Sequence, residues 1–170
     1  MTDHRQALAF IAKCDDAGKL RQLIKHAKAQ GVTEVADAAF RRLIELVPAE
    51  KRGTVQHDFW RMVNAFEHLR TEQNGRTTRL ARTRQKVARV GVLRVLEDWA
   101  VGKKTEGYDI LMGLGLPELT GEAIVLRHPT HFSASAVEKA GRRLEADGVN
   151  LQSVREYRQD PHPASDPGTA

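Results

Sequence analysis

The chain has 170 residues, of which 41% are hydrophobic and 29% are charged, and its formal net charge is +5. These proportions are near the averages of globular proteins, so they exclude a chain that is disordered throughout. The single cysteine, Cys14, excludes an intramolecular disulfide and a cysteine-based zinc site. No window approaches the roughly 18 apolar residues that span a bilayer.

Three amphipathic helices are predicted before Pro48. Gly31 is placed to end the second of them and Thr33 to begin the third, and Pro48 stops the third. The apolar stripes recur at spacings of three and four, as in helices. They are Leu8, Ile11 and Ala12; then Leu20, Leu23, Ile24 and Ala27; then Val35, Ala39, Leu43 and Val47.

Two longer helices follow a polar connector over residues 49–53. Thr54 is a good N-cap for the first, which Asn74-Gly75 ends. The second is expected to run from about Thr78 to Val101, with Gly91 a candidate position for a bend. The apolar face of the first consists of Val55, Phe59, Met62, Val63, Phe66 and Leu69.

The last third of the chain reads as short helices over about 105–114, 117–128 and 133–148, with a weaker one over 151–157. Residues 159–170 hold three prolines and no apolar anchor, so we expect a disordered tail there. The predicted fold class is all-α: a compact multi-helix bundle of seven or eight short helices with helical-hairpin units. The predicted domains are an N-terminal hairpin lobe (1–48), a bundle (54–158) and the tail (159–170).

The segments 31–40 and 115–124 resemble each other, since each has a helix before a glycine and a tight turn after it. They are either two copies of one hairpin unit or two ordinary joints with the same turn chemistry. The regular period of a solenoid is missing.

The most informative feature is a basic segment over residues 76–94, which has no acidic residue. A cationic, ordered segment favours a polyanionic partner, most commonly a phosphate backbone. We therefore predict nucleic-acid contacts from this segment. The candidate nucleic-acid-binding residues are Arg76, Thr77, Thr78, Arg79, Arg82, Arg84, Lys86, Arg89 and Arg94.

Three properties of this segment support the prediction. Helical spacing places Arg79, Arg82, Lys86 and Arg89 in one stripe. Residues 76–78 are expected at the helix start, where free backbone N–H groups favour phosphate. A helix preceded by an Asn-Gly turn and another helix loosely resembles a helix-turn-helix reader of DNA, although its loop and glycine positions fit no standard template.

Two other interpretations of the basic segment stay open. It is a solvated face if the flanking acids balance it in space, and it binds a protein if the partner is acidic. The flanking acids are Glu67, Glu72, Glu97 and Asp98.

Aromatic residues are few, which favours contact with a duplex backbone over stacking on a single strand. Trp60 falls off the apolar stripe of its helix and is assigned a packing contact in preference to base stacking. His128 and His131 could chelate a metal but lack a third ligand nearby, and His128 is assigned to the end of its helix instead. Asp109 and Glu122 only faintly match an acidic nuclease pair. We assign no catalytic residue, no metal ligand and no cofactor.

The sequence thus predicts a nucleic-acid-binding protein, with duplex DNA favoured over RNA. A helical adaptor that grips a protein through its amphipathic hairpins is the alternative, and a nuclease or other catalytic subunit is a distant third. The N-terminus has no apolar stretch typical of a signal peptide, so we expect a cytoplasmic protein without membrane contact. The composition, rich in Arg, Ala and Leu, suggests a bacterial one.

Overall fold

The computed structural model describes residues 4–157 and contains, within them, ten α-helices, two short 3-10 helices and no strand. The all-α prediction is confirmed, while the predicted tail over 159–170 lies outside the described residues. The α-helices are α1 (Arg5–Lys13), α2 (Ala17–Ala29), α3 (Thr33–Leu46), α4 (Val55–Asn74), α5 (Ala81–Val90), α6 (Val92–Val101), α7 (Glu106–Gly113), α8 (Gly121–Arg127), α9 (Ala134–Ala146) and α10 (Leu151–Glu156). None of them combines the length and the apolar character that crossing a bilayer requires.

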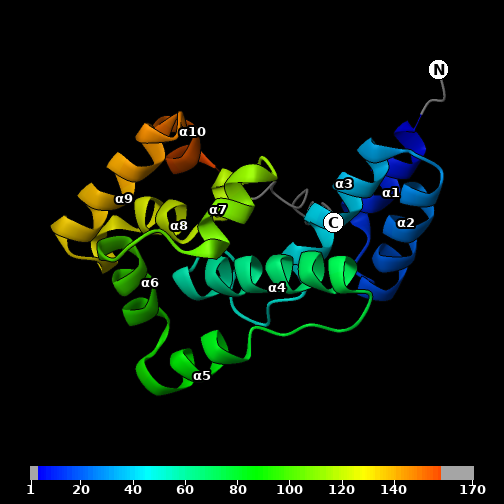
Figure 1. Ribbon diagram of the computed structural model, residues 1–170. Coiled ribbons are helices and arrows are strands. Elements are labelled where there is room, and N and C mark those ends of the chain that lie inside the picture. Colours follow the sequence, from blue (N-terminus) through cyan, green and yellow to red (C-terminus); the bar gives the residue numbers. More distant parts are fainter. Residues whose placement is uncertain (1–3, 158–170) are drawn as a thin grey trace, which may run out of the picture. The chain divides into compact units, whose positions relative to one another are not determined.

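The chain divides into two compact units, one holding residues 4–47 and the other residues 48–157. In the first unit, α2 and α3 form the predicted helical hairpin and α1 packs on α3 (Figure 1). Its core is built from the predicted apolar stripes, including Leu20, Ile24, Ala39 and Leu43. Arg42 of α3 donates to the backbone oxygen of Cys14, which holds the connection between α1 and α2 in place.

The two similar segments share a turn and then diverge. Gly31 and Gly115 both have φ of 70°, and the N–H after each glycine reaches back to a carbonyl five residues earlier, from Val32 to Ala27 and from Leu116 to Leu111. In this motif a right-handed helix ends at a residue with left-handed backbone angles, which glycine adopts without strain. After it, the first segment continues into the fourteen-residue α3, whereas the second enters a 3-10 turn over Pro117–Leu119. The likeness therefore covers the helix end and the glycine turn, and does not extend to the helices that follow.

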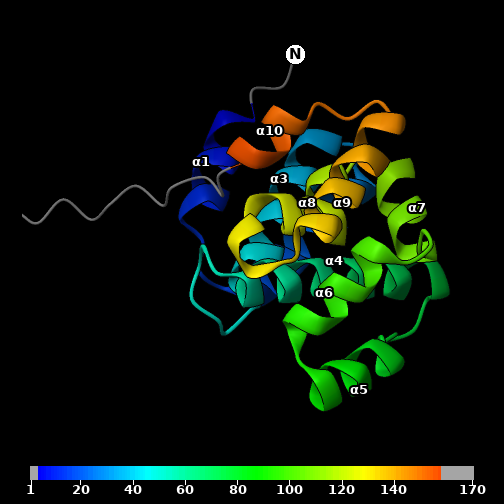
Figure 2. The same ribbon diagram turned by 90° about the vertical axis from the view of Figure 1, so that its left-hand side faces the viewer.

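Helix α8 forms the centre of the second unit. Every residue from Gly121 to Leu126 is buried, because α4, α6, α9 and α10 all contact this helix (Figures 1 and 2). Its buried carboxylate, Glu122, accepts a hydrogen bond from Arg143 of α9. Arg143 also donates to the backbone oxygens of Trp99 and Gly102, so one guanidinium joins α9 to α8 and to the end of α6.

The predicted helix over 117–128 is wrong in its first turn. Thr120 is in an extended conformation and caps α8, since its hydroxyl accepts from the N–H of Ala123 and donates to the oxygen of Pro117. The chain therefore makes a separate 3-10 turn before α8 begins at Gly121. The Thr120 side chain bonds to nearby backbone groups and so competes with a continuous helix at this point.

The predicted helix over 78–101 is two helices. Gly91 has φ of 83° and ψ of 162°, a conformation that glycine alone adopts readily, and it separates α5 from α6. The chain therefore turns at Gly91 where a bend was expected. This division is one reason why the structure has more helices than the seven or eight predicted.

Candidate nucleic-acid interface

The connector between α4 and α5 carries the first candidate residues and is tied back to α4. Gly75 ends α4 with φ of 64°. The side chain of Asn74 donates to the hydroxyl of Thr78 (3.0 Å), and the Thr78 N–H donates to the hydroxyl of Thr71 (2.9 Å). These bonds hold residues 75–80 outside any helix, so the prediction that residues 76–78 begin the helix is wrong.

Two consequences follow for the sequence predictions. Arg79 lies in the connector and not in the helical stripe with Arg82, Lys86 and Arg89. The connector over residues 75–80 is also longer than the turn of three or four residues in a helix-turn-helix motif. The resemblance to that motif is thus limited to the order of the elements.

Glu67 of α4 fixes the start of α5. Its carboxylate accepts from the Leu80 N–H and from both Nε and Nη2 of Arg84, all at 2.8 Å. Burial acts to raise the pKa of Glu67, but the bonds from Arg84 and Leu80 outweigh it and hold this pKa below its usual value. Arg84 also lies 5.0 Å above the ring of Trp60. Arg84 therefore anchors α5 to α4.

Asp98 of α6 pairs with two more of the candidate residues. Lys86 reaches it at 2.9 Å and Arg94 at 3.0 Å. The hydrogen bond from Lys86 is the main reason why the pKa of Asp98 lies below its usual value. The Lys86 pair joins α5 to α6 across the turn at Gly91, the Arg94 pair lies within α6, and both neutralise part of the basic charge.

Four arginines remain exposed without an ion pair to any residue in 4–157: Arg76, Arg79, Arg82 and Arg89. Arg76 and Arg79 lie in the connector. Arg82 and Arg89 are seven residues apart on α5, which places them two turns apart on one face. Thr77 is exposed beside them, while Thr78 is bonded to Asn74 and to the connector's own backbone.

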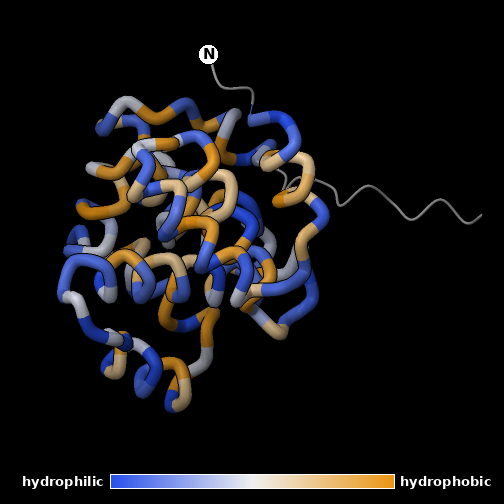
Figure 3. The backbone as a smooth tube through the Cα atoms, turned by 90° about the vertical axis from the view of Figure 1, so that its right-hand side faces the viewer, coloured by the Kyte–Doolittle hydropathy of each residue, from blue (hydrophilic) through white to orange (hydrophobic). Residues whose placement is uncertain are grey.

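Helix α5 is suited to presenting these arginines. It has no buried residue and lies at the edge of its unit, at the bottom of Figures 1 and 2. Both hydrophilic and apolar residues occur along it (Figure 3). Its first turn holds no acidic residue, but the Glu67 carboxylate accepts from the Leu80 N–H at the start of α5 and offsets the positive end of the helix dipole there.

The flanking acids divide into two groups. Glu67 and Asp98 neutralise Arg84, Lys86 and Arg94, as the solvated-face interpretation requires. Glu72 pairs with His68 instead, and Glu97 accepts from Ser133. The sequence singled out all four acids, but only the fold shows which of them reach the basic segment.

The remaining candidate groups are structural in the described part of the chain. Trp60 packs edge-on against Phe59, with ring centroids 5.3 Å apart, as its packing assignment predicted. His128 contacts the carboxylate of Asp58 through Nε2 at 2.9 Å. No group of three His, Cys, Asp or Glu residues within 4–157 is arranged to hold a metal ion.

Comparison with protein-family models, with curated proteins and with solved structures finds no match to this chain.

Proposed function

We propose that the protein binds nucleic acid, with duplex DNA as the preferred ligand, through the connector over residues 75–80 and helix α5. The observation that carries the proposal is the group of four exposed arginines, Arg76, Arg79, Arg82 and Arg89, none of which forms an ion pair within residues 4–157. An arginine guanidinium binds phosphate oxygens in a two-pronged geometry, so such a group suits a phosphate backbone. The proposal includes the expected cytoplasmic location in a bacterial cell.

The scaffold supports a defined surface. Glu67 and Asp98 hold α5 by ion pairs to Arg84 and Lys86, so the arginines project from a positioned helix. The preference for a duplex rests on the aromatic residues. Trp60 and Trp99 both pack against Phe59, and Arg84 lies over the ring of Trp60, so these rings are engaged in packing and not in an open platform for unpaired bases.

The test compares two fourfold variants in fluorescence anisotropy with duplex DNA, single-stranded DNA and structured RNA over a salt series. The first variant replaces Arg76, Arg79, Arg82 and Arg89 by Gln. The control replaces four exposed basic residues elsewhere in the same unit, namely Arg52, Lys103, Lys139 and Arg155. Both lose the same formal charge.

We expect the native chain to bind duplex DNA with Kd of about 1–100 µM at physiological salt, tightening as salt falls. Each phosphate contact contributes about 0.9 to the steepness of the plot of log affinity against log salt concentration. With four arginines removed, the slope of the first variant should be less steep than that of the native chain by up to about 3.6. The control should keep most of its slope. Equal binding by both variants would contradict the proposal.

An acidic protein partner is the second candidate, and one observation favours it. Val90 and Leu93, on either side of the turn at Gly91, are 39% and 37% exposed beside the basic face. Apolar side chains next to arginines are common in protein interfaces. A stoichiometric complex that survives high salt, without nucleic-acid binding at low salt, would favour this candidate.

A further inference from the structure

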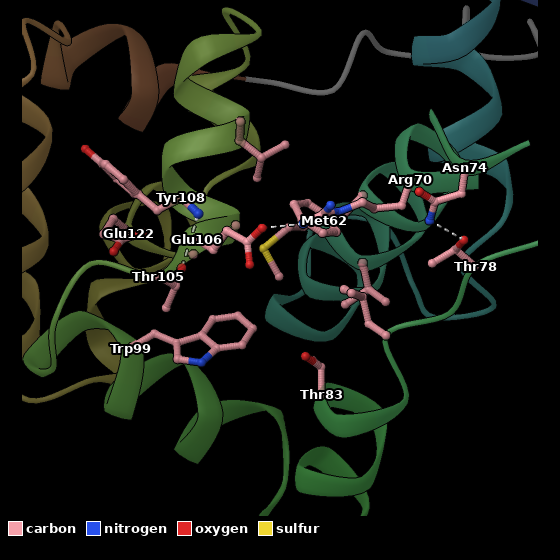
Figure 4. A pocket seen from close by; sticks show the side chains of 16 residues that line it. Met62, Arg70, Asn74, Thr78, Thr83, Trp99, Thr105, Glu106, Tyr108 and Glu122 are labelled. Atoms are coloured by element: carbon pink, nitrogen blue, oxygen red, sulfur yellow. Dashed lines mark hydrogen bonds and ion pairs between the residues drawn. The ribbon is translucent and has the colours of Figure 1, made fainter. Parts of the chain in front are cut away.

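The unit formed by residues 48–157 contains a cavity of about 480 Å³. Its walls come from α4, the connector before α5, the first turn of α5, and helices α6, α7 and α8 (Figure 4). This volume is in the range of small-molecule sites in proteins. The cavity is distinct from the arginine group, because none of the four exposed arginines lines it.

The inner surface of the cavity is largely apolar. Aromatic rings contribute much of it, since Phe66 and Trp99 both line the cavity. Aliphatic and thioether side chains complete it. They are Met62 and Val63 of α4, Leu80 of the connector and Leu111 of α7.

The charged groups that line the cavity are already paired within the protein. Arg70 of α4 is bound to Glu106 of α7 at 2.5 Å. Glu122 is bound to Arg143 at 2.5 Å, and burial raises the pKa of Glu122 despite that partner. A charged ligand would therefore find no unpaired counter-charge among these side chains, which favours a neutral ligand.

Thr83 is one of the polar lining groups that remain for a ligand. Thr83 of α5 directs its hydroxyl toward the cavity (Figure 4), and no hydrogen-bond partner for that hydroxyl lies in residues 4–157. A hydroxyl both donates and accepts, so it suits a single polar atom on an otherwise apolar molecule. Thr83 and Leu80 are only half-buried and α5 has no buried residue, so a ligand can enter past this wall without disturbing the core.

From these contacts we infer that the cavity is a binding site for a neutral, largely apolar small molecule with aromatic character and one polar atom near Thr83. The inference goes beyond the proposed function and does not depend on it, because no arginine of the nucleic-acid surface takes part.

The test uses two fluorescent probes with the same ring system and the full chain. N-phenylnaphthylamine is neutral, and anilinonaphthalene sulfonate carries an added negative charge. Titrations in about 0.5 M salt keep the exposed arginines from attracting the sulfonate, since the Debye length is then only a few Å. We expect saturable binding of the neutral probe at one site per chain, and at least about tenfold weaker binding of the anion.

Two substitutions fill the cavity from opposite walls. Thr83→Trp extends from α5, and Gly107→Leu extends from α7 toward Phe66, whose ring lies 3.6 Å from the position of an added Cβ. Each should reduce binding of the neutral probe at least about tenfold. Gln85→Trp is the control, because Gln85 is exposed on the same helix and does not line the cavity.

Absence of saturable binding by the neutral probe would overturn the inference. So would equal binding of the two probes, or an equal loss in Thr83→Trp and Gln85→Trp. Nucleic-acid affinity is not part of this readout, so a failure here leaves the proposed function standing, and a failure of that proposal leaves this inference standing.

Discussion

At the scale of single residues, a buried ionic cluster around Asp58 stabilises the second unit. Asp58 of α4 accepts from Nε of Arg127 at 3.0 Å and contacts His128 at 2.9 Å, and Arg61 lies 3.8 Å away. The ring of Tyr157 lies 5.1 Å from the Arg61 guanidinium and 5.6 Å from that of Arg127. The cluster thus connects α4, the end of α8 and the residue that follows α10.

The pKa of Asp58 is lowered by the charged and hydrogen-bonding groups around it. Burial by itself would raise the pKa, but the hydrogen bond with His128 and the charges of Arg127 and Arg61 outweigh it. The pKa is therefore held well below its usual value of 3.8. A carboxyl group whose pKa is lower in the folded chain stabilises the fold above its unfolded pKa, and that stabilisation is lost as the pH falls below it.

Asp58→Asn should reduce the free energy of unfolding by about 3–5 kcal/mol at neutral pH, because two buried guanidinium groups lose their carboxylate. The loss of stability between about pH 4 and pH 2 should also become smaller, since Asp58 no longer takes up a proton on unfolding. Urea unfolding over a pH series measures both effects. Asp109→Asn, an exposed carboxylate of the same unit, serves as control and should change stability by less than about 0.5 kcal/mol. Equal effects of the two substitutions would contradict the role of the cluster.

At the scale of elements, the turn at Gly91 determines where α5 lies. A continuous helix over 78–101 would carry its basic stripe along the same axis as the buried residues Val95, Leu96 and Ala100 of α6. The conformation of Gly91 instead changes the direction of the chain between α5 and α6. Lys86 of α5 therefore comes within ion-pair distance of Asp98 of α6. The position of Arg82 and Arg89 on α5 therefore depends on this one backbone conformation.

Gly91→Ala should loosen α5, because a residue with a Cβ pays about 1–3 kcal/mol in that conformation. Since α5 buries no residue, the strain is relieved by releasing this helix and not by unfolding the unit. Amide hydrogen exchange in residues 81–90 should accelerate about tenfold or more, with little change in the urea midpoint. Gly113→Ala is the control, as Gly113 has no positive φ and an added Cβ meets nothing within 4 Å. Unchanged exchange in Gly91→Ala would show that the turn does not hold α5.

At the scale of the whole molecule, the chain consists of two units with separate cores. The first has the Leu20, Ile24 and Leu43 core between three helices. The second is organised around buried α8 and contains both the arginine group and the cavity. Each unit has buried apolar residues of its own, which is a physical condition for a domain that folds alone.

Residues 48–157 expressed alone should therefore unfold cooperatively in urea and keep the nucleic-acid affinity proposed for the full chain to within about threefold. Circular dichroism and anisotropy measure the two properties. Residues 1–47 are the matched fragment and should show no such affinity, since they lack all four exposed arginines. A fragment over 48–157 without a cooperative transition would contradict the division into domains.

Much of this protein could be predicted from residue patterns because helices are determined locally. Spacings of three and four, the caps Thr54 and Ser133, and glycine endings at Gly31 and Gly148 identify the helices and the hairpin without any knowledge of packing. The basic segment is likewise visible in the sequence, since seven basic residues occur there without an acid.

Which of those basic residues remain available is decided by the tertiary structure alone. Glu67 lies seventeen residues before Arg84, and Asp98 lies twelve after Lys86, so only the folded chain brings these opposite charges within ion-pair distance. The cavity and the Asp58 cluster arise in the same way, from side chains far apart in the chain, such as Asp58 and Arg127. The sequence by itself determined the helices and the presence of a basic segment, because both depend on neighbours along the chain. The exposed arginines, the neutralised ones and the cavity were decided by packing, because long-range contacts set burial and charge pairing.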